Sequence, residues 1–371
     1  MEQEELHCIG CGVPIQTEDK EGLGYTPKSS LQKSEESGKA LYCQRCFRLR
    51  HYNEIQDVSL TDDDFLRLLN EIRTKDALIV NVVDIFDFNG SIIKGLHRFI
   101  GDNELLLVGN KRDLLPKSLK KGRLIQWMKE RAHEIGLRPE EVLLTSAKKK
   151  EDVLELLSTI EEYRQGRDVY IVGVTNVGKS TLINAIIQAA VGEESVITTS
   201  QFPGTTLDLI EIPLDDGHYI IDTPGIIHRE QMAHYLSPND LKAITPKKEL
   251  KPKTYQLNAG QTLFLGGLAR FDYLEGDKGS FVVYTARDLM IHRTKLEKAD
   301  AFYQKHVGEL LQPPTDLEHY PLPELVRFEF IAKEKMDIVF SGLGWITVPK
   351  GSKIAGWAPK GVAVIRRKAL I

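Results

Sequence analysis

The chain of 371 residues is 42% hydrophobic and 27% charged, with a net charge of -4, which is an ordinary composition for a globular protein of two or three domains. No apolar run approaches the roughly 18–20 residues of a membrane span, and the acidic start is neither a signal peptide nor an Arg-rich transit peptide. We therefore expect a cytoplasmic protein of bacterial type that does not associate with membranes.

Four cysteines form two Cys-x-x-Cys pairs, Cys8 with Cys11 and Cys43 with Cys46, and no cysteine is left over. Zn²⁺ takes four thiolates in a tetrahedron, and each pair presents two sulfurs to one ion. The alternatives are disulfides, which a cytoplasmic chain disfavours, and a redox pair, which would need a βαβ unit at this point. The pattern predicts a closed structural zinc site in a zinc-binding domain of residues 1–55.

The stretch between the pairs, residues 12–42, is rich in Gly, Ser, Lys and Glu and predicts an exposed, partly mobile loop. A second stretch, around and after Cys46, alternates basic and aromatic residues. A stretch of this kind can contact RNA by phosphate pairing and base stacking. The alternative is a solvated helix packed on the metal site. The bases and rings that alternate in it are Arg45, Phe47, Arg48, Arg50, His51 and Tyr52.

Three continuous apolar runs follow, at residues 76–84, 104–109 and 142–145, with a helical pattern at residues 119–135 between the last two. Continuous apolar runs are typical of strands that are buried on both faces. Strands that alternate with helices predict a parallel sheet whose strand ends form the site.

The second and third runs end in two motifs that can read guanine. Asn110-Lys-Arg-Asp113 has the pattern N-K-x-D, and Ser146-Ala-Lys148 follows the next strand. The carboxylate of Asp113 can accept hydrogen bonds from both the N1–H and the exocyclic NH2 of guanine, a pair that adenine lacks. Asn110 and Lys111 would brace the base and its loop, and the Ala147 amide would face the guanine carbonyl.

A phosphate loop comes next. A strand at residues 168–173 runs into Gly173-Val-Thr-Asn-Val-Gly-Lys-Ser180, with the pattern G-x-x-x-x-G-K-S, and an amphipathic helix begins at Lys179. The glycines let backbone amides point at phosphates at the N-terminus of that helix. Lys179 is expected to reach the β- and γ-phosphates, and Ser180 to bind Mg²⁺.

Two switch motifs follow the phosphate loop. In Pro203-Gly-Thr-Thr206, Thr206 is expected to bind Mg²⁺ when the γ-phosphate is present, with Thr205 as the alternative. Asp222-Thr-Pro-Gly225 ends the next strand, so Asp222 would hold Mg²⁺ through water and the Gly225 amide would sense the γ-phosphate. Ile226 stands where Ras-like enzymes carry the Gln that orients water, which predicts slow intrinsic hydrolysis.

The guanine motifs precede the phosphate loop, whereas the phosphate loop comes first in Ras-like GTPases. We infer a circularly permuted P-loop GTPase domain of α/β class at residues 56–236, with a mostly parallel sheet in three layers. Lys179, Thr206 and Gly225 are expected to carry the hydrolysis. The residues expected to bind GTP or GDP are Asn110, Lys111, Asp113, Ser146, Ala147, Lys148, Thr175, Asn176, Val177, Gly178, Lys179, Ser180, Thr181, Asp222 and Gly225.

The remaining part, residues 237–371, predicts a β-rich domain. A Pro- and Lys-rich linker at residues 246–252 leads to short alternating segments that predict antiparallel strands, and residues 295–306 predict a helix. The clearest strand segments are residues 261–265, 279–284 and 336–340.

This last part is also basic. Residues 245–371 carry 20 Lys and Arg against 14 Asp and Glu, while residues 1–244 carry 29 against 39. The asymmetry, together with Trp345 and Trp357, favours contact with RNA or the ribosome. The alternatives are a chance excess of Lys on a solvated surface and Trp side chains in the core. The basic residues of the tail are Lys350, Lys353, Lys360, Arg366, Arg367 and Lys368.

The motifs resemble those of the YqeH family of circularly permuted GTPases, which they match over about two-thirds of the chain, including Asp84-Ile-Phe-Asp87-Phe-Asn-Gly-Ser. The resemblance implies a role in assembling the small (30S) ribosomal subunit, with rRNA or a ribosomal protein as the partner. It also implies a C-terminal domain similar to the RNA-binding attenuation protein TRAP. Plant relatives were proposed to make nitric oxide, but no cysteine is left here to bind haem.

Asn176 matches the asparagine of K⁺-stimulated GTPases such as the tRNA-modifying MnmE, which implies a K⁺ ion near the phosphates. The alternative is a plain loop residue. Two other functions stay open, a permuted GTPase that acts on tRNA or a metabolic substrate, and a sensor of GTP or (p)ppGpp with little hydrolysis. We expect a monomer.

Overall fold

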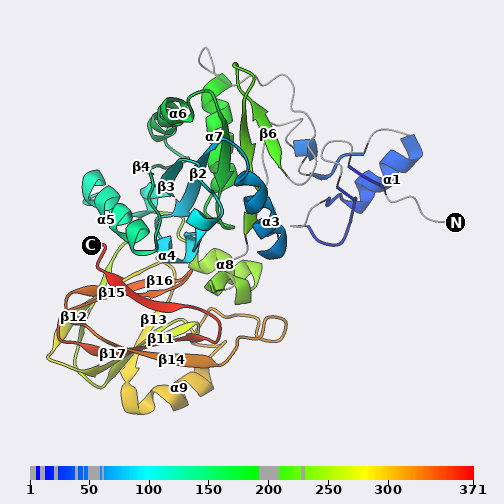
Figure 1. Cartoon of the computed structure of the whole chain (residues 1–371). Coiled ribbons are helices and arrows are strands. Elements are labelled where there is room, and N and C mark those ends of the chain that lie inside the picture. The colour runs from blue at the N-terminus through cyan, green and yellow to red at the C-terminus, as the bar shows by residue number, and fades with distance from the viewer. Residues whose placement is uncertain are drawn as a thin grey trace. The chain divides into compact units, whose positions relative to one another are not determined.

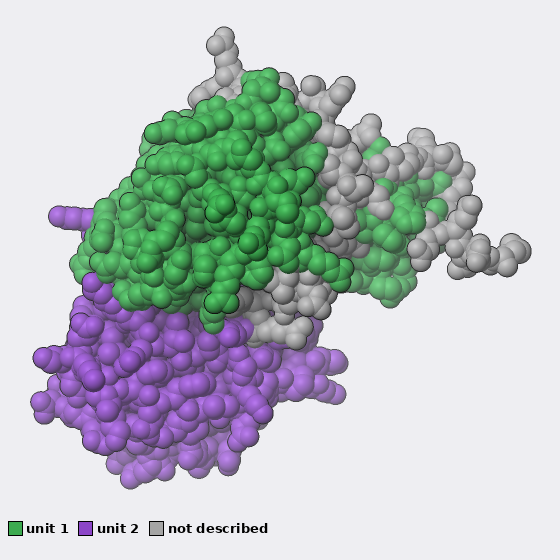
Figure 2. Space-filling view, viewed as in Figure 1, with its two compact units in different colours: residues 1–112, 121–227 green, residues 113–120, 228–371 purple. Residues whose placement is uncertain are grey.

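The computed structural model describes residues 6–8, 13–20, 24–37, 41–44, 46–48, 59–60, 62–191, 209–226 and 230–371. Their contacts divide the chain into two compact units, coloured separately in Figure 2. The first unit comprises residues 1–112 and 121–227, and the second comprises residues 113–120 and 228–371. The domain boundaries 1–55, 56–236 and 237–371 stay a prediction.

The first unit contains a six-stranded sheet in the order β4-β3-β2-β5-β7-β6, in which only β6 runs antiparallel to its neighbour (Figure 1). Every residue of β3 is buried, as are all but the last of β2, which explains the continuous apolar runs. The strands are β2 (Ala77–Asp84), β3 (Leu105–Asn110), β4 (Glu141–Leu144), β5 (Asp168–Val172), β6 (Ile210–Pro213) and β7 (Tyr219–Asp222).

The helices of this unit follow the predicted pattern, and α5 lies within the range expected at residues 119–135. Helix α6 packs on β2 and β5 and against α7. A short parallel pair joins β1 (Ser59–Leu60) to β8 (Gly225–Ile226). The helices are α3 (Asp62–Ile72), α4 (Phe88–Ser91), α5 (Lys121–Glu134), α6 (Lys150–Arg164) and α7 (Lys179–Val191).

The sheet order explains how the permutation leaves the fold intact. Strand β5, which leads into the phosphate loop, lies inside the sheet between β2 and β7. The strands that precede it in the chain, β2, β3 and β4, all lie on one side of it, and β6 and β7 lie on the other. Exchanging the chain order of the two halves therefore changes the connections but no strand neighbour, and the predicted permuted P-loop fold is confirmed.

In the N-terminal part, helix α1 (Lys28–Ser37) lies within the stretch that we expected to be a loop, so that expectation is wrong for these ten residues. The carbonyl of Pro27 accepts hydrogen bonds from the amides of Ser30 and Leu31, at 2.8 and 3.2 Å, which starts the first turn. Phe47 and Arg48 are exposed, whereas Arg45, Arg50, His51 and Tyr52 lie outside the described residues.

The second unit is built from two five-stranded antiparallel sheets, in the orders β13-β10-β11-β17-β14 and β18-β15-β16-β12-β9 (Figure 1). One continuous apolar core contains buried side chains from both sheets. The strands are β9 (Lys253–Leu257), β10 (Gln261–Leu265), β11 (Ala269–Glu275), β12 (Gly279–Thr285), β13 (Ile291–Lys295), β14 (Leu325–Ile331), β15 (Met336–Phe340), β16 (Gly344–Val348), β17 (Lys353–Pro359) and β18 (Val364–Lys368).

The two sheets approach each other closely at Gly356 in β17. A Cβ atom there would lie 2.9 Å from Val364 Cγ1 and 3.4 Å from the Phe340 ring, so a larger residue would push the sheets apart. Strands β10 and β15 have the predicted bounds. The helix expected at residues 295–306 is a 3-10 turn at Leu296–Lys298 followed by α9 (Ala299–His306), and Lys295 itself belongs to β13, where it pairs with Gln261.

Two hairpins of this unit repeat one pattern, which the sequence analysis missed. Strands β10 and β11 are joined by the three-residue loop 266–268, and strands β15 and β16 by the three-residue loop 341–343. In each hairpin a threonine and an aspartate are cross-strand partners, Thr262 with Asp272 and Asp337 with Thr347. The two Oγ1–Oδ1 distances are both 2.6 Å. Each hairpin lies in the middle of one sheet, so the unit has two related centres.

The remaining helix of the second unit, α8 (Pro238–Ile244), is capped by Ser237, whose Oγ accepts from the Asp240 amide at 3.1 Å. No helix among the described parts of the chain is both long and apolar enough to cross a membrane.

Candidate nucleotide-binding site and metal centre

The phosphate loop between β5 and α7 has the backbone that its glycines predict. Asn176 and Gly178 both have left-handed backbones, with φ of 65° and 81°. A Cβ atom on Gly173 would lie 2.8 Å from the Val82 carbonyl oxygen of β2, so only glycine fits there without displacing the sheet. These residues give the loop its tight turn at the N-terminus of α7, where backbone amides can face an anion.

The guanine motif is hydrogen-bonded to the phosphate loop. The Nδ2 group of Asn110, at the end of β3, donates to the carbonyls of Val177 at 2.9 Å and Gly178 at 3.3 Å. The Oδ1 atom of the same side chain is buried and has no partner in the described chain. A buried acceptor without a donor is costly unless a ligand or water satisfies it, so the site fits a nucleotide that bridges the two loops.

Lys111 forms a second bridge between the same loops. Its Nζ lies 2.7 Å from Asp84 Oδ2 and also donates to the backbone carbonyl of Asn176. Asp84 is the last residue of β2 and the sheet partner of Asn110, so the register places the carboxylate beside the motif. The sequence analysis quoted Asp84 without a role, and its position at the end of a neighbouring buried strand is the signal that could have identified it.

The two residues expected to manage the phosphates and Mg²⁺ contact each other. Lys179 Nζ donates to Asp222 Oδ1, and only 2% and 1% of the two residues are exposed. They meet because β5 and β7 are neighbours and both end at this edge of the sheet. Ser180, also buried, follows Lys179 in α7. The arrangement holds a cation and a carboxylate ready where phosphate and a metal would compete for them.

Gly225 lies against the phosphate loop. A Cβ atom on it would come within 3.2 Å of the Thr175 side chain and within 3.2 Å of the Thr175 amide nitrogen. A side chain at this position would therefore press on the loop. The motif predicted to be the second switch thus lies against the phosphate loop.

The loop with Ser146, Ala147 and Lys148 is tied to the guanine motif through backbone hydrogen bonds. The Thr145 amide donates to the Gly109 carbonyl at 2.9 Å, and the Arg112 amide donates to the Thr145 carbonyl at 3.0 Å. The two loops expected to read guanine are therefore held together at the ends of β3 and β4.

Two of the predicted nucleotide-binding residues, and the predicted Mg²⁺ ligand Thr206, lie apart from these contacts or outside the described residues. Asp113 lies in the short 3-10 helix Arg112–Leu114, in the segment that groups with the second unit. Thr181 is exposed in the first turn of α7. Thr206 lies outside the described residues, together with Thr205.

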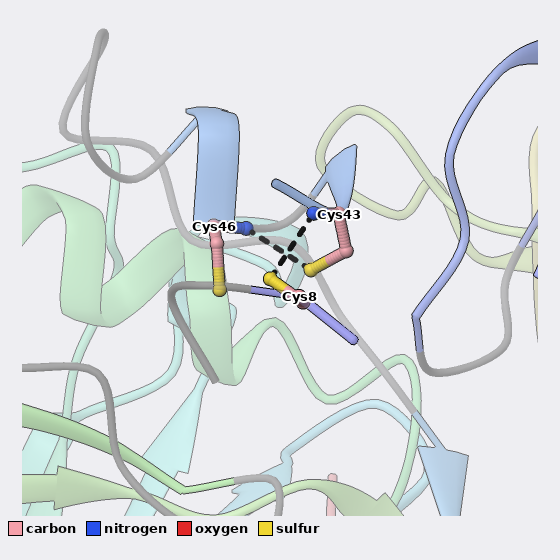
Figure 3. A group of neighbouring side chains, drawn as sticks. All are labelled: Cys8, Cys43 and Cys46. Atoms are coloured by element: carbon pink, nitrogen blue, oxygen red, sulfur yellow. Dashed lines mark hydrogen bonds between the residues drawn. The ribbon is translucent and has the colours of Figure 1, made fainter. Parts of the chain in front are cut away.

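Three of the four cysteines converge (Figure 3). The sulfur atoms of Cys8, Cys43 and Cys46 all lie within 4.8 Å of one another. The Cys43 amide donates to Cys8 Sγ at 3.1 Å, and the Cys46 amide donates to Cys43 Sγ at 3.5 Å (Figure 3). Amide donors of this kind stabilise thiolates, which are the form that binds metal. The cluster could hold a metal ion, and Cys11 lies outside the described residues.

Comparison with known protein families gives two matches. A family described as "YqeH-like, C-terminal" matches residues 278–370, and a family described as "50S ribosome-binding GTPase" matches residues 168–252. The second match covers the phosphate loop, Asp222 and Gly225, and the first lies within the unit of two antiparallel sheets.

Relatives match nearly the whole chain. "Uncharacterized protein YqeH" of Bacillus subtilis (strain 168) is 61% identical over 370 residues, which cover 99% of this chain and 100% of that protein. "NO-associated protein 1, chloroplastic/mitochondrial" of Arabidopsis thaliana is 31% identical over 400 residues, covering 95% of this chain and 71% of that protein. Among solved structures, "Crystal structure of GNP-bound YlqF from T. maritima" is 21% identical with a TM-score of 0.30, covering 45% of this chain and 58% of that chain.

The B. subtilis protein is matched over its full length, and the phosphate loop, Asn110 and Lys111 of the guanine motif, and the permuted sheet order occur together in one unit. The chain therefore belongs to the YqeH family, and it is a GTPase with a circularly permuted P-loop domain.

Proposed function

We propose that this GTPase is a cytoplasmic switch in the assembly of the small (30S) ribosomal subunit, which it contacts through rRNA or a ribosomal protein. The observation that carries the switch is the direct bonding of the guanine motif to the phosphate loop, from Asn110 to Val177. Because one side chain joins both loops, guanine recognition and phosphate binding are completed together.

Binding of GTP would exchange partners at the buried ion pair. Lys179 would turn from Asp222 to the β- and γ-phosphates, and the carboxylate so released would hold Mg²⁺ through water, with Ser180 as a direct ligand. Mg²⁺, when bound, neutralises charge on the phosphates. Thr206 and Gly225 would then order around the γ-phosphate, and hydrolysis would release both switches.

Within the site, Asn176 would supply its side-chain oxygen to K⁺. The backbone carbonyl of Asn176 already accepts from Lys111, and its left-handed backbone is part of the turn of the phosphate loop. Faster hydrolysis in KCl than in NaCl at equal ionic strength is the expected result. Equal rates would contradict the K⁺ site without affecting GTP binding.

Hydrolysis without a partner should be slow, because the residue after Gly225 is Ile226 and an alkyl side chain cannot orient water by hydrogen bonding. Ile226→Gln is expected to change the intrinsic rate. A variant with the rate of the natural protein would show that this side chain does not limit the reaction.

The Cys cluster would hold Zn²⁺ through Cys8, Cys11, Cys43 and Cys46, and would serve the domain at residues 1–55 as a structural centre. The basic C-terminal domain at residues 237–371 would supply a ribosome-contacting surface. Arg367 in the tail is buried and bonded to Asp337, and Trp345 in β16 is buried, so neither is offered to RNA. Lys360 and Arg366 are exposed and are better candidates for RNA contact.

The deciding experiment measures GTP hydrolysis in KCl with purified 30S subunits, with 50S subunits as the matched control and Lys179→Ala as the blank. A rate that rises with 30S subunits alone supports the proposal. A rise with 50S subunits alone would move the partner to the subunit that the matched GTPase family is named after. A rate that neither subunit changes would favour a tRNA-associated GTPase or a nucleotide sensor.

A further inference from the structure

The four edge strands of the second unit differ in how they are protected. Strands β13, β9 and β18 each carry a lysine, at Lys295, Lys253 and Lys368, which discourages pairing with another strand. Strand β14, the fourth edge, has the sequence Leu-Val-Arg-Phe-Glu-Phe-Ile with neither lysine nor proline. It also exposes aliphatic side chains, since Val326 is 36% exposed and Ile331 is 58% exposed.

The outward backbone groups of β14 can be assigned from its pairing with β17. The Lys360 amide donates to the Glu324 carbonyl at 2.9 Å, and the Ala332 amide donates to the Ser352 carbonyl at 2.8 Å. Antiparallel pairing alternates, so the even-numbered residues of β14 bond to β17 and the odd-numbered ones point away. These outward residues are Leu325, Arg327, Glu329 and Ile331, and no group of the described chain bonds to their amides or carbonyls.

The sequence of β14 is complementary to itself when it is reversed about Phe328. Reversal places Arg327 opposite Glu329, Val326 opposite Phe330, and Leu325 opposite Ile331. Arg327 and Glu329 now form an ion pair with each other along the strand, and their side chains are 39% and 45% exposed. Opposite charges directly across a strand pair stabilise it, whereas like charges destabilise it.

We propose that two copies of the chain pair through β14, antiparallel and centred on Phe328. The register agrees with the free backbone groups, because it sets Arg327 opposite the second copy's Glu329, and both are outward residues that can exchange two hydrogen bonds. A register shifted by one residue would oppose an outward residue to one that already bonds to β17. The five-stranded sheet that ends in β14 would join the same sheet of the second copy, and the two would form one sheet of ten strands.

The pairing would also complete the edge of the core. Phe328 and Phe330 pack only partly against the core, because β14 has no neighbour on its outer side. In the dimer Val326 would lie against the second copy's Phe330, and the two Phe328 rings would be neighbours. A contact through one strand is small, so the dimer is expected to be reversible and dependent on concentration. This departs from the monomer expected from the sequence, and it does not depend on the proposed role at the ribosome.

Sedimentation velocity of the full chain over a hundredfold range of concentration tests the proposal. The natural protein should shift from monomer to dimer, and Arg327→Glu or Glu329→Arg alone should weaken the dimer at least tenfold, since each places two like-charged pairs opposite one another. Glu334→Arg makes the same charge change at an exposed residue beyond the strand and should leave the dimer intact.

Charge exchange separates pairing from misfolding. An equimolar mixture of Arg327→Glu and Glu329→Arg should form a heterodimer, since each pair across the strands is then one Glu and one Arg, and the double variant R327E/E329R should again dimerise with itself. A natural protein that is monomeric at every concentration would overturn the proposal. So would a dimer that survives both single variants, or single variants that fail to rescue each other while their circular dichroism is native.

Discussion

Both units bury charged side chains, but they use them in different ways. In the GTPase unit Lys179 and Asp222 are buried against each other, at the edge of the sheet where a nucleotide would bind. In the second unit Asp272 is buried too, but it accepts from Thr262 at 2.6 Å, Arg270 at 2.8 Å and Trp357 at 2.8 Å. The first pair can exchange its partners for a ligand, whereas the second set is complete.

The second hairpin repeats part of this arrangement. Asp337 accepts from Thr347, Arg367 and the Leu370 amide, and the Arg367 guanidinium lies 5.0 Å from the Trp345 ring centroid. The matching distance from Arg270 to Trp357 is 4.7 Å. Burial of a charge therefore does not identify a functional site in this protein. What distinguishes the site is a buried charge whose partner can be replaced.

The largest effect is expected at Lys179, the buried cation whose partner a ligand can replace. Lys179→Ala is expected to lower the rate of GTP hydrolysis about 10³-fold, because the cation that faces the transferred phosphoryl group is lost. Lys129→Ala is the matched control, since Lys129 pairs with Glu141 at 3.3 Å in a half-exposed ion pair of the same unit. A single-turnover assay measures both. A Lys179→Ala rate within tenfold of the natural protein would contradict the assignment.

Removal of Asp272 from its hydrogen-bonded set should lower the stability of the second unit. Asp272→Ala would leave Arg270 buried with one carboxylate instead of two, and we expect the second unit to lose about 3–5 kcal/mol. Asp300 is the other partner of Arg270, and its side chain is 82% exposed. Asp300→Ala should therefore lower the stability by less than about 1 kcal/mol. Hydrogen exchange of β10 and β11 in the full chain reports the difference. Equal effects of the two variants would show that burial does not control the cost.

A smaller effect is expected where the two loops of the site are joined. Asn110→Ala removes the bonds to Val177 and Gly178, and the affinities for GTP and GDP should both fall about tenfold. Asn103→Ala is the control, because Asn103 donates to the carbonyls of Ile72 and Ile100 at the other end of β3. It should lower stability without a specific loss of affinity. Titration calorimetry that finds Asn110→Ala unchanged would argue against the bridge.

The smallest effect concerns pH. Burial, and then the nearby charge of His306, lower the pKa of His292 below its ordinary value of 6.5. The neutral ring is therefore favoured in the fold, where it stacks on Phe302 at 4.4 Å. Stability from this contact is present above pH 6.5 and declines as the pH falls through 6.5 to the lowered pKa. Hydrogen exchange of α9 should show the decline, and His292→Phe should flatten it. The same slope in both proteins would exclude His292 as the source.

Much of the GTPase unit could be predicted because its signals are local. The N-K-x-D and G-x-x-x-x-G-K-S patterns lie within a few residues each, and buried parallel strands are continuous apolar runs that need no partner to be recognised. The permutation followed from the order of these motifs alone. The bounds of β10 and β15 were also predictable from local signals, since each is a short apolar-rich segment between turns.

What could not be predicted depends on strand register. Asp84 meets Lys111, and Asp272 meets Trp357, only because particular strands are neighbours at a particular register, which composition does not encode. The same applies to Arg367, which a count of basic residues places on the surface but which pairs beside Asp337 in the fold. Helix α1 was missed because Leu31 is its one apolar residue, so the sequence has no apolar face to reveal a period.

The permuted order also determines when the sheet can close during synthesis. Strands β2, β3 and β4 leave the ribosome before β5, so one side of β2 pairs early with β3 while the other side waits. About 80 residues separate β2 from β5, which at roughly 5–20 residues per second is a delay of several seconds. A nascent chain of this protein thus presents an open apolar edge of β2 for that interval. In a GTPase that begins with its phosphate loop, the strand equivalent to β5 is synthesised first, so this edge would be paired at a different stage.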